Sequence, residues 1–194
     1  MADVALSSLK AWFQREAAKE AKKDVLKRSD RWGGLIGMIG IVIVLIFFAS
    51  HLASRTGFFT VDFGAASAIL FFGASAWGLI ASGIRFVTGK KSPAKPFDII
   101  GSVIVFISLL YFLASFQFNF SHIADVLPDF LKWALQWITD DFAKGLMVLA
   151  TVVLLFVIPY QVVSYRYLRI EMSKPQEVPA SIAGPAQNEE APKQ

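Results

Sequence analysis

The sequence predicts an all-α integral membrane protein whose core is a four-helix transmembrane bundle. Its 194 residues are 55% hydrophobic and 18% charged, with a mean hydropathy of +0.54. Soluble domains carry about 45–50% apolar and about 25% charged residues. The apolar residues also stand in long blocks without a polar face, whereas a helix packed on a soluble core keeps a polar stripe. Both observations favour lipid as the surroundings of these blocks.

Four blocks have the length of a transmembrane helix, which needs about 20 apolar residues to cross about 30 Å of hydrocarbon. Because lipid offers no partner to backbone N–H and C=O groups, each block is expected to be helical. The first block exceeds the apolar core of a signal peptide, about 7–15 residues, so we expect it to be retained. The four-span region covers residues 33–172, with predicted spans at residues 33–53, 63–84, 99–118 and 142–165.

Lysine and arginine are unevenly distributed among the segments outside these spans. Eight precede the first span, four lie between the second and third, and four follow the last, so these segments hold sixteen of the nineteen. Cytoplasmic segments of membrane proteins carry an excess of Lys and Arg. Both termini are therefore predicted to be cytoplasmic, with two loops outside. The first span follows no transit-like segment, which favours a prokaryotic plasma membrane.

Residues 1–32 are predicted to form a basic amphipathic cytoplasmic helix, with periodic apolar residues over positions 3–31. Such a helix can lie on an anionic leaflet, serve only as a charged topological anchor, or bind a partner helix, and the sequence leaves these roles open. Trp12 and Trp32 are predicted to be interfacial anchors. The periodic apolar residues are Leu6, Leu9, Phe13, Ala17, Ala21 and Val25.

The second outer loop is predicted to carry an interfacial helix over residues 129–140. It follows Pro128, and Trp133 and Trp137 lie one turn apart as anchors, where each indole can bury its ring and keep its N–H in water. This helix either connects the last two spans or offers a docking surface to a neighbouring subunit. The proline-rich tail, residues 173–194, has too little apolar surface to offset ordering entropy and is predicted to be disordered in the cytoplasm.

Small residues at helical spacing indicate where the spans pack closely. They give the second span a continuous stripe, so we expect it to be the central helix. The same residues could pack within the chain or between copies of it. Pro159 is predicted to kink the fourth span near its cytoplasmic end. The predicted helix-packing residues are Gly33, Gly37 and Gly40 in the first span and Ala74, Gly78 and Ser82 in the second.

The central halves of the four spans contain no ionisable residue. Proton relays, ion-coupled transport and voltage sensing need charge at depth, so the sequence argues against them. The absence of cysteine excludes disulfides, thiolate metal sites and cysteine nucleophiles. Neither a phosphate-binding glycine loop nor a nucleophile-elbow motif occurs in the sequence. We therefore predict no catalytic residue and no cofactor.

Three residues predicted near the outer surface resemble a ligand set: His51, His122 and Asp125. Imidazole and carboxylate groups suit a transition metal. The two histidines are far apart in the sequence and lack the spacing of a helical metal motif. The prediction is therefore no metal site, with these three side chains as the candidates if one exists.

These observations predict a non-catalytic multi-pass membrane subunit that scaffolds or stabilises a larger membrane complex. Expected partners are membrane lipids and other membrane subunits or further copies of the chain. Nucleic acid is not expected, since membrane topology already explains the basic segments. One alternative is a small self-assembling channel or transporter. A third reading is a membrane-embedded lipid-modifying enzyme, whose chemistry would have to come from His51, His122, Asp125 or Asp129.

Overall fold

The computed structural model describes residues 2–174, and this part of the chain is all-helical, without β-strands. Four of its helices are long and apolar enough to cross a membrane, as predicted. All but two residues of the predicted disordered tail, residues 173–194, lie outside the described residues. The elements are α1 (Ala2–Lys22), α2 (Arg28–Ser54), α3 (Ala65–Thr88), η1 (Ser92–Ala94), α4 (Lys95–Ser115), η2 (Phe120–His122), α5 (Asp129–Lys132) and α6 (Asp140–Met172).

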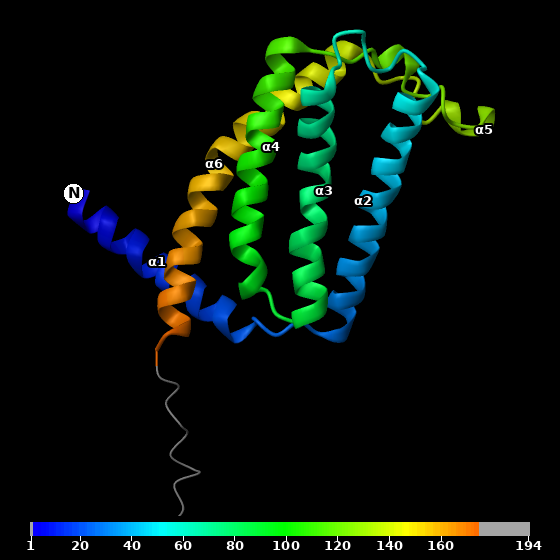
Figure 1. Ribbon diagram of the computed structural model, residues 1–194. Helices are drawn as coiled ribbons and strands as arrows, with labels where there is room; N and C mark the ends of the chain where they lie inside the picture. Colours follow the sequence, from blue (N-terminus) through cyan, green and yellow to red (C-terminus); the bar gives the residue numbers. More distant parts are fainter. Residues whose placement is uncertain (1, 175–194) are drawn as a thin grey trace, which may run out of the picture.

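The four long helices stand side by side in one row, in the order α2, α3, α4 and α6 (Figure 1). The backbone of α3 approaches both α2 and α4, and that of α4 also approaches α6. Among the described residues, α2 approaches neither α4 nor α6, so the expected four-helix bundle is an open layer. In a membrane, where lipid tails are as apolar as leucine side chains, no hydrophobic force would close such a layer.

The buried core lies at one end of the row, which we call the aromatic end. Phe58, Phe112, Phe118 and Ile123 are each at most 6% exposed and form its centre. The two connections there are paired: Asn119 N–H donates to the Phe58 carbonyl at 2.7 Å. A further backbone bond of 3.1 Å joins the same connections, from Thr60 N–H to the Gln117 carbonyl. The aromatic end thus fastens the row through phenylalanine packing and loop pairing.

The predicted interfacial helix at residues 129–140 is helical only over Asp129–Lys132, and turns follow as far as Trp137. Thr139 begins the next helix: its backbone is extended, and its side chain caps α6 by accepting from Phe142 N–H at 3.2 Å. In α5, the hydrogen bond and charge of Lys132, 2.7 Å away, lower the pKa of Asp129. Trp133 and Trp137 are 68% and 59% exposed in the chain, and their role as interfacial anchors stays a prediction.

The basic helix predicted within residues 1–32 is interrupted. Helix α1 ends at Lys22, and α2 begins at Arg28 as one helix that already includes Trp32. Val25, expected on the apolar face, is 72% exposed and forms an isolated antiparallel bridge with Lys90. The interruption arises because the segment between the two helices bonds with the connection from α3 to α4, which is distant in the sequence.

The two small-residue stripes differ in their surroundings. A methyl group added to Gly78 would lie 3.1 Å from Ile41 Cδ1, so α3 packs closely on α2 at this point. Ala74 borders two cavities, and Ser82 is half-buried in the same helix. A methyl group added to any glycine of the α2 stripe would meet no atom within 4 Å. These α2 glycines are Gly33, Gly37 and Gly40.

Pro159 lies inside α6, which continues as a single helix to Met172. Proline lacks the N–H that would bond the Leu155 carbonyl. A bend at this position stays a prediction. With 33 residues, α6 is about 50 Å long, and it extends beyond the predicted span at the same end as α1.

Trp77 of α3 packs closely on Gly101 of α4. A methyl group added to Gly101 would lie 2.6 Å from Trp77 Cδ1. The indole is held in place because Trp77 Nε1–H donates to the Phe97 carbonyl at 2.9 Å. Gly101 was not among the predicted packing residues, and its role comes from the large side chain that it faces.

Gly101→Ala is expected to lower the melting temperature of the purified protein. The added methyl would overlap the Trp77 ring, which cannot turn away without losing its bond to Phe97. Overpacking of this kind costs about 1–3 kcal/mol. Thermal unfolding in detergent, followed by intrinsic fluorescence, measures the change.

The matched control is Gly73→Ala, where an added methyl meets no atom within 4 Å. Alanine favours a helix over glycine by about 1 kcal/mol, so this variant should keep or raise the melting temperature. Equal melting temperatures for Gly101→Ala and the unchanged protein would contradict the packing described.

Candidate functional site

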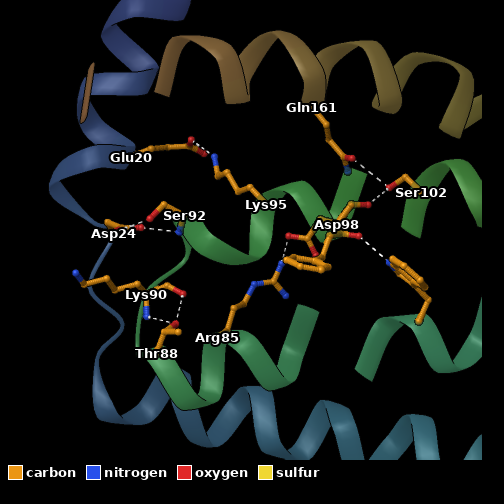
Figure 2. Close-up of polar contacts among 12 residues, drawn as sticks. Glu20, Asp24, Arg85, Thr88, Lys90, Ser92, Lys95, Asp98, Ser102 and Gln161 are labelled. Carbon is orange, nitrogen blue, oxygen red and sulfur yellow. Dashed lines mark hydrogen bonds and ion pairs between the residues drawn. The ribbon is translucent and has the colours of Figure 1, made fainter. Parts of the chain in front are cut away.

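A network of charged and polar side chains lies at the opposite end of the row, which we call the basic end (Figure 2). Here α3 ends and α4 begins. Gly89 terminates α3 in a left-handed conformation (φ 64°) that suits glycine, and its N–H bonds the Arg85 carbonyl at 2.9 Å. The antiparallel neighbours α3 and α4 therefore bring the last turn of one beside the first turn of the other. As a result, Arg85 Nη2 forms an ion pair with Asp98 Oδ2.

Helix α1 and the loop that follows it join this network through two acidic residues, Glu20 in the helix and Asp24 in the loop. Glu20 pairs with Lys95 at the start of α4. The carboxylate of Asp24, which is 8% exposed, accepts from Ser92 N–H at 2.7 Å and from Ser92 Oγ at 3.0 Å. The Asp24 carbonyl accepts from Lys91 N–H at 3.0 Å. The loop after α1 is thus fixed to the connection between α3 and α4.

A polar contact also joins α4 to α6. Ser102 Oγ lies 2.9 Å from the Asp98 carbonyl and 3.1 Å from Gln161 Oε1 (Figure 2). Helix α1 crosses α6 nearby, where Phe13 stacks on Tyr167 with 5.6 Å between ring centroids. The neighbouring Trp12 is 46% exposed and approaches Tyr160 at 6.4 Å. Besides the start of α2, whose Arg31 donates to the Phe86 carbonyl of α3, four helices therefore meet at the basic end: α1, α3, α4 and α6.

These contacts surround a cavity of about 370 Å³, which we call the basic-end cavity. It contains two cations and two carboxylates at the end of otherwise apolar helices. Among the described residues, Gln161 Nε2 and the Ser164 hydroxyl make no hydrogen bond, and both belong to the cavity lining. The cavity thus offers unused hydrogen-bond donors. Its lining is Glu20, Arg85, Lys95, Asp98, Ile99, Ser102, Tyr160, Gln161 and Ser164.

The predicted candidate ligands do not form a metal site. His51 is 1% exposed, and both ring nitrogens are engaged: Nε2–H donates to the Ile123 carbonyl at 3.0 Å, and Nδ1 lies 2.6 Å from Thr56 Oγ1. His122 Nδ1 lies 2.8 Å from Asp125 Oδ2, and both side chains are partly exposed. Within residues 2–174, no three His, Asp or Glu side chains are placed to share a metal ion. His51 instead joins α2 to the segment between α4 and α6 through its bond to the Ile123 carbonyl.

Sequence reasoning missed most of the basic-end network. It placed Arg85 and Asp98 at the ends of spans but did not pair them. Glu20 and Asp24 were recognisable as acidic residues one turn apart in a basic segment, and Gln161 as the only side-chain amide in the fourth span. Each of these was a signal for a polar contact. The identity of the partner, however, depends on how the helices are arranged.

No protein-family model matches the chain, and neither a curated protein nor a solved structure matches it at a significant level. A functional interpretation therefore depends on the geometry of the chain itself. That geometry supplies an open layer of apolar helices, a closed aromatic end and a polar cavity at the basic end.

Asp24→Ala is expected to loosen the connection between α3 and α4. The variant removes the acceptor of both Ser92 bonds, and hydrogen bonds to a charged group contribute about 1.5–3 kcal/mol. Limited trypsin digestion in detergent, with mapping of the fragments, should show faster cleavage at Lys90 and Lys91.

Asp30→Ala is the control, because Asp30 is exposed and its side chain bonds no other described residue. The variant removes the same charge only a few residues away. If both variants are cleaved at the rate of the unchanged protein, Asp24 does not hold the connection.

Proposed function

We propose that the chain is inserted in a prokaryotic plasma membrane with both termini in the cytoplasm, and that it is a non-catalytic subunit of a larger membrane complex. The open row of α2, α3, α4 and α6 carries this proposal, because it leaves helix faces available to a second protein layer. The excess of Lys and Arg at the basic end supports the orientation.

Exposure along the row supports a role in association. Within the most apolar window of each helix, 6% of residues are buried in α2 and none in α6. Each of these outer helices has one neighbour in the row, α3 for α2 and α4 for α6. In lipid, helices associate through close packing that small residues favour. The open stripe on α2 provides such a surface, so we propose α2 as the contact with the partner.

A non-catalytic role is in keeping with how the ionisable groups are used. Both nitrogens of His51 make structural contacts. The carboxylates of Glu20 and Asp98 are paired with cations, and the carboxylate of Asp24 bonds Ser92. Two of these groups contact a hydroxyl, His51 that of Thr56 and Asp24 that of Ser92, but His51 and Asp24 are only 1% and 8% exposed, which leaves a substrate little access.

Extraction of the tagged protein from its native membrane in mild detergent tests the proposal. We expect a complex with another membrane protein at a fixed ratio, measured by native mass spectrometry. Gly37→Leu should dissociate it without lowering the melting temperature of the isolated chain, since a Cβ atom added there meets no atom within 4 Å. Gly145→Leu, in the equally open environment of Gly145 on α6, should leave the complex intact.

A homogeneous monomer without partners would contradict the subunit role. A homo-oligomer that conducts ions or solutes in liposomes would favour the alternative, a self-assembling channel. Reporters fused to either end test the membrane topology separately, and activity outside the cell would contradict the orientation.

A further inference from the structure

We propose that the basic-end cavity binds the phosphate group of an anionic phospholipid, with Lys95 and Arg85 as the cationic contacts. This inference goes beyond the proposed subunit role. It shares with that role only the placement of the basic end at a membrane surface. Basic cavities between transmembrane helices on the cytoplasmic side are a setting in which anionic headgroups bind.

The first argument is the number of donors that remain free. Arg85 contacts Asp98 through Nη2 alone, although a guanidinium carries five N–H donors. Lys95 contacts only Glu20, which leaves two of its three donors. Gln161 Nε2 and the Ser164 hydroxyl add neutral donors that bond no described residue. A phosphate group, which has several acceptor oxygens, matches this surplus.

The second argument is that the ion pair at Lys95 is easily exchanged. The side chain of Glu20 is 45% exposed, whereas that of Lys95 is 22% exposed. An exposed ion pair contributes only about 0–1 kcal/mol, so replacing this carboxylate with phosphate costs little. The side chain of Glu20 can then rotate toward the solvent, while Lys95 stays at the cavity. The Arg85–Asp98 pair, whose side chains are 35% and 30% exposed, can stay in place, and Arg85 can still donate through its free N–H groups.

The third argument is that an apolar path leads away from the cavity. Tyr160 lines the cavity, and Phe156, one turn earlier on the same face of α6, is 70% exposed. Val153 and Leu149 continue this face at helical spacing and are 49% and 59% exposed. A lipid with its phosphate in the cavity can therefore lay an acyl chain along α6. Free phosphate has no acyl chain and would gain nothing from this apolar face of α6.

Lipid titration of the purified full-length protein in neutral detergent tests the proposal by native mass spectrometry. The probes are short-chain phosphatidic acid, phosphatidylcholine with the same acyl chains, and inorganic phosphate alone. We expect phosphatidic acid to bind about tenfold more tightly than phosphatidylcholine, whose choline cation lies near the two basic side chains. Inorganic phosphate should compete only weakly. Since no partner is present, the result does not depend on the subunit role.

Lys95→Gln should weaken binding of phosphatidic acid about tenfold. The matched control is Lys174→Gln, which removes the same charge from an exposed pair with Glu171 outside the cavity and should leave binding unchanged. Should Lys95→Gln fail to fold, Gln161→Leu tests the same cavity without breaking an ion pair. In that variant Ser102 keeps its bond to the Asp98 carbonyl, and binding should fall several-fold.

Equal weakening by Lys95→Gln and Lys174→Gln would mean that the lipid responds to surface charge alone and would overturn the assignment. Equal affinity for phosphatidic acid and phosphatidylcholine would overturn it as well. If inorganic phosphate binds as tightly as phosphatidic acid, the cavity recognises a soluble phosphate and the lipid assignment is wrong.

Discussion

Apolar helices surrounded by lipid gain little from packing on one another, and this constraint shapes the whole chain. In the membrane setting that we propose, hydrophobic burial cannot hold α2, α3, α4 and α6 together along their length. The specific contacts concentrate at the two ends of the row instead. Along the middle, the close contact of Trp77 with Gly101 shows how one small residue lets neighbouring helices approach. The fold is best understood as four helices fastened at both ends.

The two ends use different chemistry. At the aromatic end, buried phenylalanines and paired backbone segments close the structure, and both ring nitrogens of His51 bond within it. At the basic end, ion pairs and the carboxylate of Asp24 join segments that are far apart in the sequence. The aromatic end leaves two buried side-chain oxygens without a partner among the described residues, Thr60 Oγ1 and Gln117 Oε1, but its buried residues include no lysine or arginine. The basic end keeps free donors beside a cavity and is therefore the end with capacity to bind a ligand.

Hydropathy was sufficient to predict the four long helices, because length and apolar composition determine whether a segment can cross lipid. It could not predict an open row, since an apolar residue carries no information about whether lipid or protein covers it. The sequence pattern could not predict that α1 ends at Lys22 either. The loop that follows is held by the bond of Asp24 to Ser92, which is 68 residues away. The helix predicted at residues 129–140 ends at Lys132, and within the predicted range Thr139 caps the next helix. Periodicity therefore predicted element types better than their partners.

The open row needs a cover for its apolar faces, and the polar cavity can bind a charged headgroup. A single layer of helices exposes apolar surface on both sides, and either lipid tails or another protein must cover it. In the membrane setting that we propose, Arg85, Lys95 and Gln161 would be located where such a layer meets the headgroup region. A lipid held there would add surface to α6, on the far side of the row from the open stripe of α2. Lipid binding at α6 and protein binding at α2 can therefore occur together, because they use opposite edges of the same layer.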